Sequence, residues 1–153
     1  MMDNNIDYQT LIDELRAQSA IDLIALAFVQ TSQLDYVLKW QYASGNINNR
    51  YKRVVLQSGK GIAGLVYKSG KPMYIKDITD NIITDLYNYP IVVSEDLKRL
   101  VAFPIFEGQQ DKVKGVILLG NRDTKTSELK DYQHVYTLFL KQISASGFNG
   151  VSW

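Results

Sequence analysis

The sequence contains no cysteine and a single histidine, His134. Without cysteine there are no disulfides, iron–sulfur clusters, thiolate nucleophiles or thioether-linked pigments. Zinc sites usually take two or more His or Cys ligands, and no D-x-D-x-D-G calcium loop is present. We therefore expect no metal and no cofactor. Since no nucleophile–base pair is visible either, we expect a protein that is not an enzyme. We interpret His134 as a surface or internally satisfied residue of a helix, not as a catalytic base.

An excess of charge of one sign is also lacking. Seventeen Lys and Arg oppose sixteen Asp and Glu, a formal net charge of +1. This balance argues against a nucleic-acid or anionic-membrane footprint spread over the surface. The longest apolar stretch, residues 21–29, carries Asp22 and is too short to span a bilayer, and residues 1–18 do not resemble a targeting signal. We expect a soluble, cytoplasmic protein with neither a nucleic-acid nor a membrane partner.

What is present is an ordinary globular composition. The chain has 153 residues, of which 46% are apolar and 11% aromatic. This length is typical of one domain. We expect a single domain over residues 1–153, with a core at about 5–146 and a tail at 147–153 whose flexibility the sequence leaves open.

Apolar residues recur at helical spacing near both ends of the chain. The first set is Ile6, Leu11, Ile12 and Leu15. It predicts a helix with Asn4 as its cap. A second stripe predicts a helix over residues 127–145, with acidic residues near its positive end.

Two pairs of β-rich runs, each joined by a short polar segment, predict two hairpins. They cover residues 21–30 with 36–43 and residues 100–106 with 113–119. Because hairpins pair their strands antiparallel, the order helix, hairpin, middle section, hairpin, helix indicates the α+β class. Within 36–43 the even-numbered side chains are apolar, which places Trp40 in the middle of the buried strand face.

The section between the hairpins is less regular. We expect a loop or poor helix, a short strand, a glycine turn that opens a short helix, another strand, and an irregular segment with one helical turn. In chain order these are residues 44–53, 54–57, 58–70, 72–75 and 77–98, with the turn at 94–97.

The glycine turn, Gly59–Gly64, matches the dinucleotide-binding pattern G-x-G-x-x-G, and Asp77 follows at nearly the distance of the ribose-binding acid. A doubly wound fold, however, needs repeated parallel strand–helix–strand units, and this turn lies between two hairpins. Dinucleotide binding is therefore a weak alternative.

The same turn carries a different resemblance. Residues 55–72 resemble the central signature of GAF domains, in which a Gly-Lys-Gly-Ile-Ala-Gly turn leads into a short helix and then Gly-Lys-Pro. Residues 99–105 and 113–119 resemble two later strands of that family. The resemblance implies a mostly antiparallel central sheet. It also implies terminal helices on one face, and short helices and loops enclosing a ligand pocket on the other.

Within the family the chain is similar to the stand-alone nitrate receptors. The matching features are the absent cysteine, the strand at 36–40, the Gly-Ile-Ala-Gly helix start and the loop at 88–91. This similarity implies an intracellular sensor of nitrate, or of nitrite as well. Such a sensor restrains a partner histidine kinase of a two-component system that controls nitrate respiration and assimilation, until the anion binds.

A pocket for such an anion can be assembled from amides and apolar walls. The free N–H groups of a helix start attract anions, and Trp40 offers one indole N–H. The expected ligand-binding residues are Trp40, Ile62, Ala63, Tyr89, Pro90, Ile91 and Ala102. This set contains no Lys, Arg or His, so we expect an affinity that is flat from about pH 6 to 8 and exclusion of sulfate and phosphate.

Each of these residues also has a structural explanation. Gly61 and Gly64 serve the turn in any GAF domain, and Trp40 on an apolar strand face is a core residue by default. The alternatives are therefore a GAF dimerisation module with a filled pocket, or a sensor of another small ligand. A homodimer or kinase contact could use apolar surface on the terminal helices, extended by Phe148 and Trp153.

Overall fold

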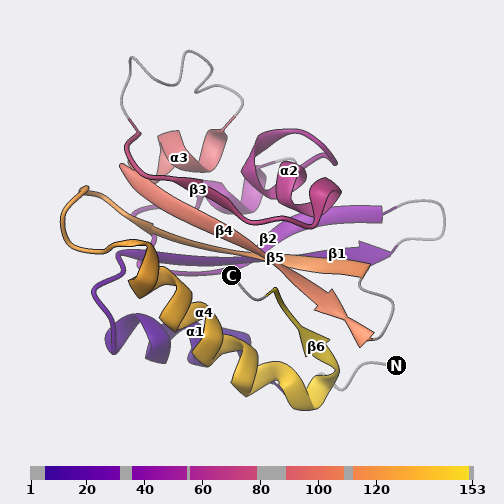
Figure 1. The fold of residues 1–153 in the computed structure, drawn as a ribbon. Helices are drawn as coiled ribbons and strands as arrows, with labels where there is room; N and C mark the ends of the chain where they lie inside the picture. The colour runs from indigo at the N-terminus through magenta and orange to yellow at the C-terminus, as the bar shows by residue number, and fades with distance from the viewer. Residues whose placement is uncertain (1–5, 32–35, 55, 79–88, 109–111, 152–153) are drawn as a thin grey trace.

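A computed structural model shows an antiparallel sheet with helices on both faces (Figure 1). It describes residues 6–31, 36–54, 56–78, 89–108 and 112–151. The strands are β1 (Leu23–Thr31), β2 (Tyr36–Ser44), β3 (Met73–Ile75), β4 (Arg99–Glu107), β5 (Lys112–Asn121) and β6 (Phe148–Asn149). Their order is β2-β1-β5-β4-β3, and β6 pairs with β4. The α+β class and both hairpins are confirmed.

Two longer helices, α1 (Tyr8–Ala17) and α4 (Leu129–Ile143), cover one face of the sheet (Figure 1). The cap of α1 is not Asn4 but Asp7, whose carboxylate accepts a hydrogen bond from the Thr10 N–H at 3.0 Å. At the start of α4, Glu128 and Asp131 form a capping box. The terminal helices thus share one face, as the family resemblance implies.

The opposite face is covered by short elements. These are the 3₁₀ helix η1 (Arg50–Arg53), α2 (Gly61–Ser69) and α3 (Pro90–Ser94). Ile62, Val66 and Ile91 from these helices pack with Leu38 and Trp40 of β2 in one buried cluster. A 3₁₀ segment, η4 (Ser144–Ser146), follows α4 and leads into β6.

A β-bulge in β2 changes the face of the sheet to which the side chains after Trp40 point. Leu26 pairs with Tyr42 and Ala27 with Trp40, so Gln41 is an extra residue on β2. Trp40 consequently packs with α2 and α3, whereas Tyr42 packs with α1 and α4. The prediction that all even-numbered side chains of this strand share one face is therefore wrong beyond Trp40.

The middle section differs from the sequence prediction in two places. Instead of a strand, Leu56 makes an isolated bridge to Leu38, and Gln57 makes one to Lys60. The loop or poor helix expected at 44–53 is confirmed as a loop that leads into η1. The predicted turn at 94–97 is displaced, since α3 begins at Pro90, where a proline at the first helical position has its φ already set.

The C-terminal segment is tied to the sheet as far as the structure describes it. Phe148 and Asn149 pair with Glu107 and Phe106 of β4. The Val151 N–H donates to the Tyr136 hydroxyl at 3.1 Å. Trp153, which we expected to extend an apolar contact surface, lies outside the described residues.

Candidate ligand pocket

A cavity of about 230 Å³ lies where the start of α2 meets the start of α3 and the centre of β2. We call it the α2–α3 pocket. Its lining residues are Trp40, Val54, Leu56, Gln57, Lys60, Gly61, Ile62, Ala63, Tyr89, Pro90 and Ile91. Six of the seven residues expected from the sequence are therefore brought together here. The seventh, Ala102, is fully buried in β4 and belongs to the core behind the pocket, not to its lining.

The start of α2 faces this pocket without a side-chain cap. Lys60 occupies the N-cap position but makes no capping hydrogen bond. The first N–H groups of an α-helix have no partner inside the helix, and they carry its partial positive charge. Because Gly61, Ile62 and Ala63 line the cavity, the pocket lies against the end of the helix that attracts anions.

The glycines of the turn have a structural role. Gly61 has φ +67°, a left-handed conformation that side chains disfavour. A Cβ on Gly64 would lie 1.9 Å from the Gln57 carbonyl oxygen, so only glycine permits this close approach. Every strand pairing of the described sheet is antiparallel. The Gly59–Gly64 turn is therefore not part of a parallel βαβ unit, and the dinucleotide alternative loses its structural basis.

Trp40 supplies an unpaired donor. The side chain is only 3% exposed, and its Nε1 finds no hydrogen-bond partner among the described residues. A buried N–H without a partner costs about 1–3 kcal/mol, and native proteins rarely keep one. An anion in the adjoining cavity is one way to satisfy it.

Five lining residues were not among those expected from the sequence: Val54, Leu56, Gln57, Lys60 and Gly61. The expected lining contained no cation, but the turn preceding α2 brings the exposed Lys60 to the rim. Its position as the residue immediately before the helix start was the available signal. An exposed ammonium is screened by solvent, so it attracts anions weakly and does not replace the buried donors.

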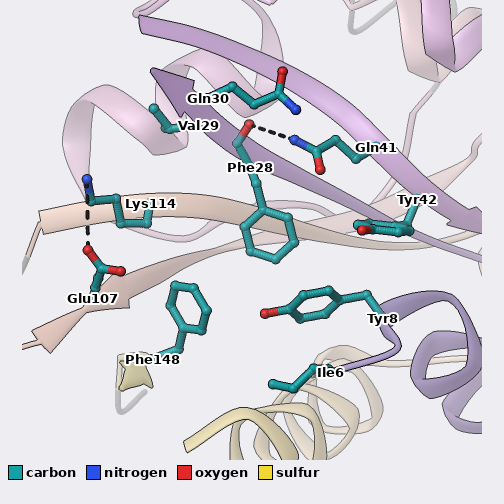
Figure 2. Close-up of a pocket in the computed structure, with 10 residues that line it drawn as sticks. All are labelled: Ile6, Tyr8, Phe28, Val29, Gln30, Gln41, Tyr42, Glu107, Lys114 and Phe148. Carbon is teal, nitrogen blue, oxygen red and sulfur yellow. Dashed lines mark hydrogen bonds and ion pairs between the residues drawn. The ribbon is translucent and has the colours of Figure 1, made fainter. Parts of the chain in front are cut away.

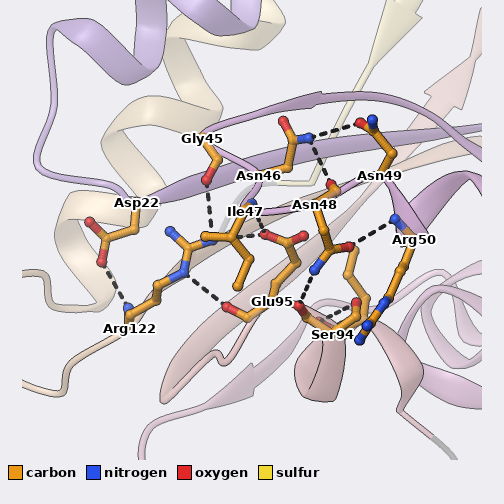
Figure 3. Close-up of polar contacts among 11 residues, drawn as sticks. Asp22, Gly45, Asn46, Ile47, Asn48, Asn49, Arg50, Ser94, Glu95 and Arg122 are labelled. Carbon is orange, nitrogen blue, oxygen red and sulfur yellow. Dashed lines mark hydrogen bonds and ion pairs between the residues drawn. The ribbon is translucent and has the colours of Figure 1, made fainter.

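The wall formed by α3 is fixed at its far end by a partly buried ion pair between Glu95 and Arg122 (Figure 3). Glu95 follows α3 and is fully buried, and its Oε1 lies 2.7 Å from the Arg122 guanidinium. Arg122 also donates to the backbone oxygens of Glu95 and Gly45. Burial and the Glu95 carboxylate together raise the pKa of Tyr51 on η1. The contacts of Arg122 with Glu95 and Gly45 therefore connect the end of α3, which forms this wall of the pocket, to the end of β2.

A second and larger cavity, about 530 Å³, lies on the other face of the sheet (Figure 2). We call it the aromatic groove. It is lined by Ile6, Tyr8, Phe28, Val29, Gln30, Gln41, Tyr42, Glu107, Lys114 and Phe148. Three of its polar side chains have partners: Lys114 pairs with Glu107 at 3.9 Å, and Gln41 donates to the Phe28 carbonyl at 3.5 Å. Burial, with a smaller effect of Tyr42, raises the pKa of Tyr8 to about 12.

Other classes of site find little support in the structure. Within the described ranges no three His, Asp or Glu side chains gather closely enough to hold a metal ion. His134 is exposed on α4, away from the α2–α3 pocket, which confirms its interpretation as a surface residue. No helix among the described residues is long and apolar enough to cross a membrane.

Comparison with known proteins finds no matching family model and no matching curated protein. Solved structures do match. A hypothetical protein of Staphylococcus aureus is 35% identical, with a TM-score of 0.69; the match covers 79% of this chain and 97% of the other. NreA of Staphylococcus aureus, solved with its nitrate binding site mutated, is 34% identical, with a TM-score of 0.70. That match covers 81% of this chain and 90% of NreA.

More distant structures share the fold alone. The GAF domain region of a Geobacter sulfurreducens protein is 16% identical, with a TM-score of 0.66, and the match covers 91% of this chain and 92% of that one. Three observations support one family assignment: the layered sheet, the uncapped α2 start and the similarity to NreA. This chain belongs to the same family as NreA and has the fold of GAF domains.

Proposed function

We propose that this protein is a cytoplasmic nitrate receptor that binds the anion in the α2–α3 pocket, without catalysis. The observation that carries the proposal is the buried, unpartnered Trp40 Nε1 beside an uncapped helix start in a small apolar cavity. Its similarity to NreA, a protein with a nitrate binding site, supports the choice of anion.

The ligand would be held by neutral donors. The indole N–H and the amides of Ile62 and Ala63 would donate to its oxygens, and Tyr89, Pro90 and Ile91 would close the cavity. A hydrogen bond to an ion contributes about 1.5–3 kcal/mol, and a helix end adds about 0.3–1 kcal/mol, or up to about 2 when partly buried. These contributions suit micromolar binding of a weakly hydrated monoanion.

Selectivity for nitrate over sulfate and phosphate follows from the lack of a buried positive charge among the described residues of the α2–α3 pocket. Sulfate and phosphate carry more charge, so burying them without a buried cation costs far more. Lys60 at the rim does not remove this cost, because it is exposed. We expect nitrate, and more weakly nitrite, to bind. The affinity should be flat from about pH 6 to 8, because no lining residue is a histidine.

The signal would pass to a second protein. In this proposal nitrate-free protein restrains a sensor histidine kinase of a two-component system, and nitrate relieves the restraint. The genes controlled would be those of nitrate respiration and assimilation. The GAF dimerisation alternative expects a pocket filled by the chain's own side chains, whereas the α2–α3 pocket keeps about 230 Å³.

The test is thermal unfolding of the protein in a panel of sodium salts: nitrate, nitrite, sulfate, phosphate and chloride. A ligand at 100 times its Kd adds about 2.7 kcal/mol to the free energy of unfolding. Nitrate should raise the midpoint at concentrations where sulfate, phosphate and chloride do not. Equal shifts for all five anions would refute specific binding. A shift with another ligand alone would make the protein a sensor of that ligand.

A further inference from the structure

Large apolar side chains are exposed at few places in the described chain. They are Val37, Ile47 and Val93, and none lies on α1 or α4. Residues of these helices such as Leu11, Leu138 and Leu140 are only partly buried, so the apolar contact surface expected there stays a prediction. Ile47 and Val93 are 59% and 57% exposed, well above Val37 at 36%. Solvated side chains of this size in a small region often mark a contact surface.

Ile47 and Val93 lie on two segments that are joined by side-chain hydrogen bonds. Figure 3 shows these bonds between Ile47 and Asn48 on one segment and Ser94 and Glu95, which follow Val93, on the other. The Asn48 amide donates to the Ser94 carbonyl at 2.7 Å, and the Ile47 N–H donates to Glu95 Oε1 at 2.9 Å. The Asn48 side-chain oxygen also accepts from the Arg50 N–H at 2.8 Å. The exposed residues Ile47 and Val93 thus lie where hydrogen bonds connect the segment that leads into η1 with the end of α3.

Positive charge borders this junction. Arg50, Lys52 and Arg53 of η1 are all exposed, and the first turn of η1 has no acidic residue. The ion pairs found among the described residues do not involve them. Lys52 lies 5.9 Å over the Tyr51 ring. Three cations within four residues give a local positive field on a molecule whose net charge is only +1.

We propose that Ile47 and Val93, with Arg50, Lys52 and Arg53, form the docking surface for a partner protein; we call it the η1–α3 surface. The partner would present an apolar segment flanked by carboxylates. Charge complementarity argues for this chemistry, since carboxylates would pair with the three cations. It also disfavours a second copy of this chain, whose own cations would be brought face to face.

The η1–α3 surface shares an element with the ligand pocket. Val93 lies on α3, and the first residues of that helix, Pro90 and Ile91, line the α2–α3 pocket. A ligand that shifts or orders α3 therefore acts on the residues that the partner contacts. By linkage, nitrate must change the partner's affinity by the same factor by which the partner changes nitrate affinity. This inference rests on the proposed receptor function.

The experiment measures binding of the purified sensor histidine kinase of the same regulatory system to the full chain, with and without nitrate. The apolar variant combines Ile47→Ser and Val93→Ser, and its control is Val37→Ser. The charge variant combines Arg50→Glu and Arg53→Glu, and its control combines Lys125→Glu and Lys130→Glu. Calorimetry with nitrate on every variant shows whether the α2–α3 pocket is intact.

We expect both test variants to weaken kinase binding at least tenfold and both controls to change it less than twofold. The nitrate affinity of every variant should stay within twofold of that of the unaltered protein. The charge variant should also lose most of the salt dependence of binding. Kinase binding that is unchanged in both test variants overturns the surface but leaves the receptor function standing. No kinase binding to the unaltered protein overturns both the surface and its kinase partner. Self-association, or retention of duplex DNA, that the charge variant abolishes would assign the surface to another occupant.

Discussion

The two faces of the sheet are covered in different ways. On one face α1 and α4 bury large side chains almost completely, and the Phe103 and Tyr136 rings stack at 4.0 Å. On the other face, short helices meet small strand residues such as Ala25 and Ala27, and the α2–α3 pocket remains. Long amphipathic helices pack closely against their face except at the aromatic groove, whereas helices of nine residues or fewer leave space where their ends meet β2.

In the proposed function the ligand occupies the α2–α3 pocket and not the larger aromatic groove. The aromatic groove is more than twice as large as the α2–α3 pocket, and three of its polar side chains, Lys114, Glu107 and Gln41, have partners inside the protein. The smaller pocket holds the buried Trp40 Nε1 without a partner and an uncapped helix start. The proposed assignment of the anion to the smaller pocket therefore rests on these donors and not on volume.

The largest expected effect tests the packed face. Phe139 of α4 is fully buried, so Phe139→Ala should lower the free energy of unfolding by about 3–5 kcal/mol through lost packing and a cavity. Nitrate affinity of the folded fraction should not change, because the residue lies across the sheet from the pocket. Chemical denaturation and calorimetry measure the two quantities. A large loss of nitrate affinity would show that the two faces are coupled.

The next effect tests the unpartnered donor. Trp40→Phe keeps an aromatic ring but removes the indole N–H. Loss of a hydrogen bond to an ion should weaken nitrate binding by about 1.5–3 kcal/mol, roughly tenfold to a hundredfold. Without ligand, removal of the unpaired N–H favours the folded state and the loss of packing by this buried ring opposes it, so a thermal melt must show that the variant is folded.

The matched control for the donor is Tyr42→Phe, two positions along the same strand but on the aromatic-groove face. It should leave nitrate affinity unchanged in the same calorimetric titration. Equal losses in both variants would contradict the assignment of the anion to the α2–α3 pocket.

A smaller effect concerns alkaline pH. Burial raises the pKa of Tyr136 to about 12, from 10.0 in the unfolded chain. The contribution of the neutral Tyr136 hydroxyl to the free energy of unfolding is therefore fully present below pH 10. It is lost as the pH rises toward 12, because Tyr136 releases its proton in the unfolded chain first. At pH 11 the loss from this residue is about 1.4 kcal/mol.

The check is the pH dependence of unfolding in the unaltered protein and in Tyr136→Phe. The variant lacks the phenol, and also the bonds to Pro104 and Val151, so it starts less stable. Its stability should nevertheless fall less steeply between pH 10 and 12. Parallel curves would mean that Tyr136 does not titrate in this range.

The smallest effect concerns the rim of the α2–α3 pocket. Lys60→Gln should weaken nitrate binding by about 0.2–1 kcal/mol at low salt, and by less at high salt, because an exposed charge is screened. Calorimetry at two ionic strengths measures this. Lys68→Gln, an exposed lysine near the end of α2, is the control. A hundredfold loss with Lys60→Gln would make this lysine a direct ligand.

The sequence determined the elements whose signals are local. Apolar residues at helical spacing predicted α1 and α4, and β-rich runs predicted the two hairpins. The Gly-Ile-Ala-Gly start located α2, because only glycine tolerates the φ of +67° at Gly61 and the close approach at Gly64. The expected pocket residues followed from the family resemblance, and six of the seven line one cavity.

Only the tertiary structure decided the rest, because those features depend on contacts between distant segments. The extra residue Gln41 turns Tyr42 to the other face, and no periodicity within β2 reveals a bulge set by its pairing with β1. Burial of Glu95 depends on Arg122, 27 positions away, and on the backbone of Ile47. The unpartnered Trp40 Nε1 likewise follows from which groups the fold brings near it, and the sequence does not contain that information.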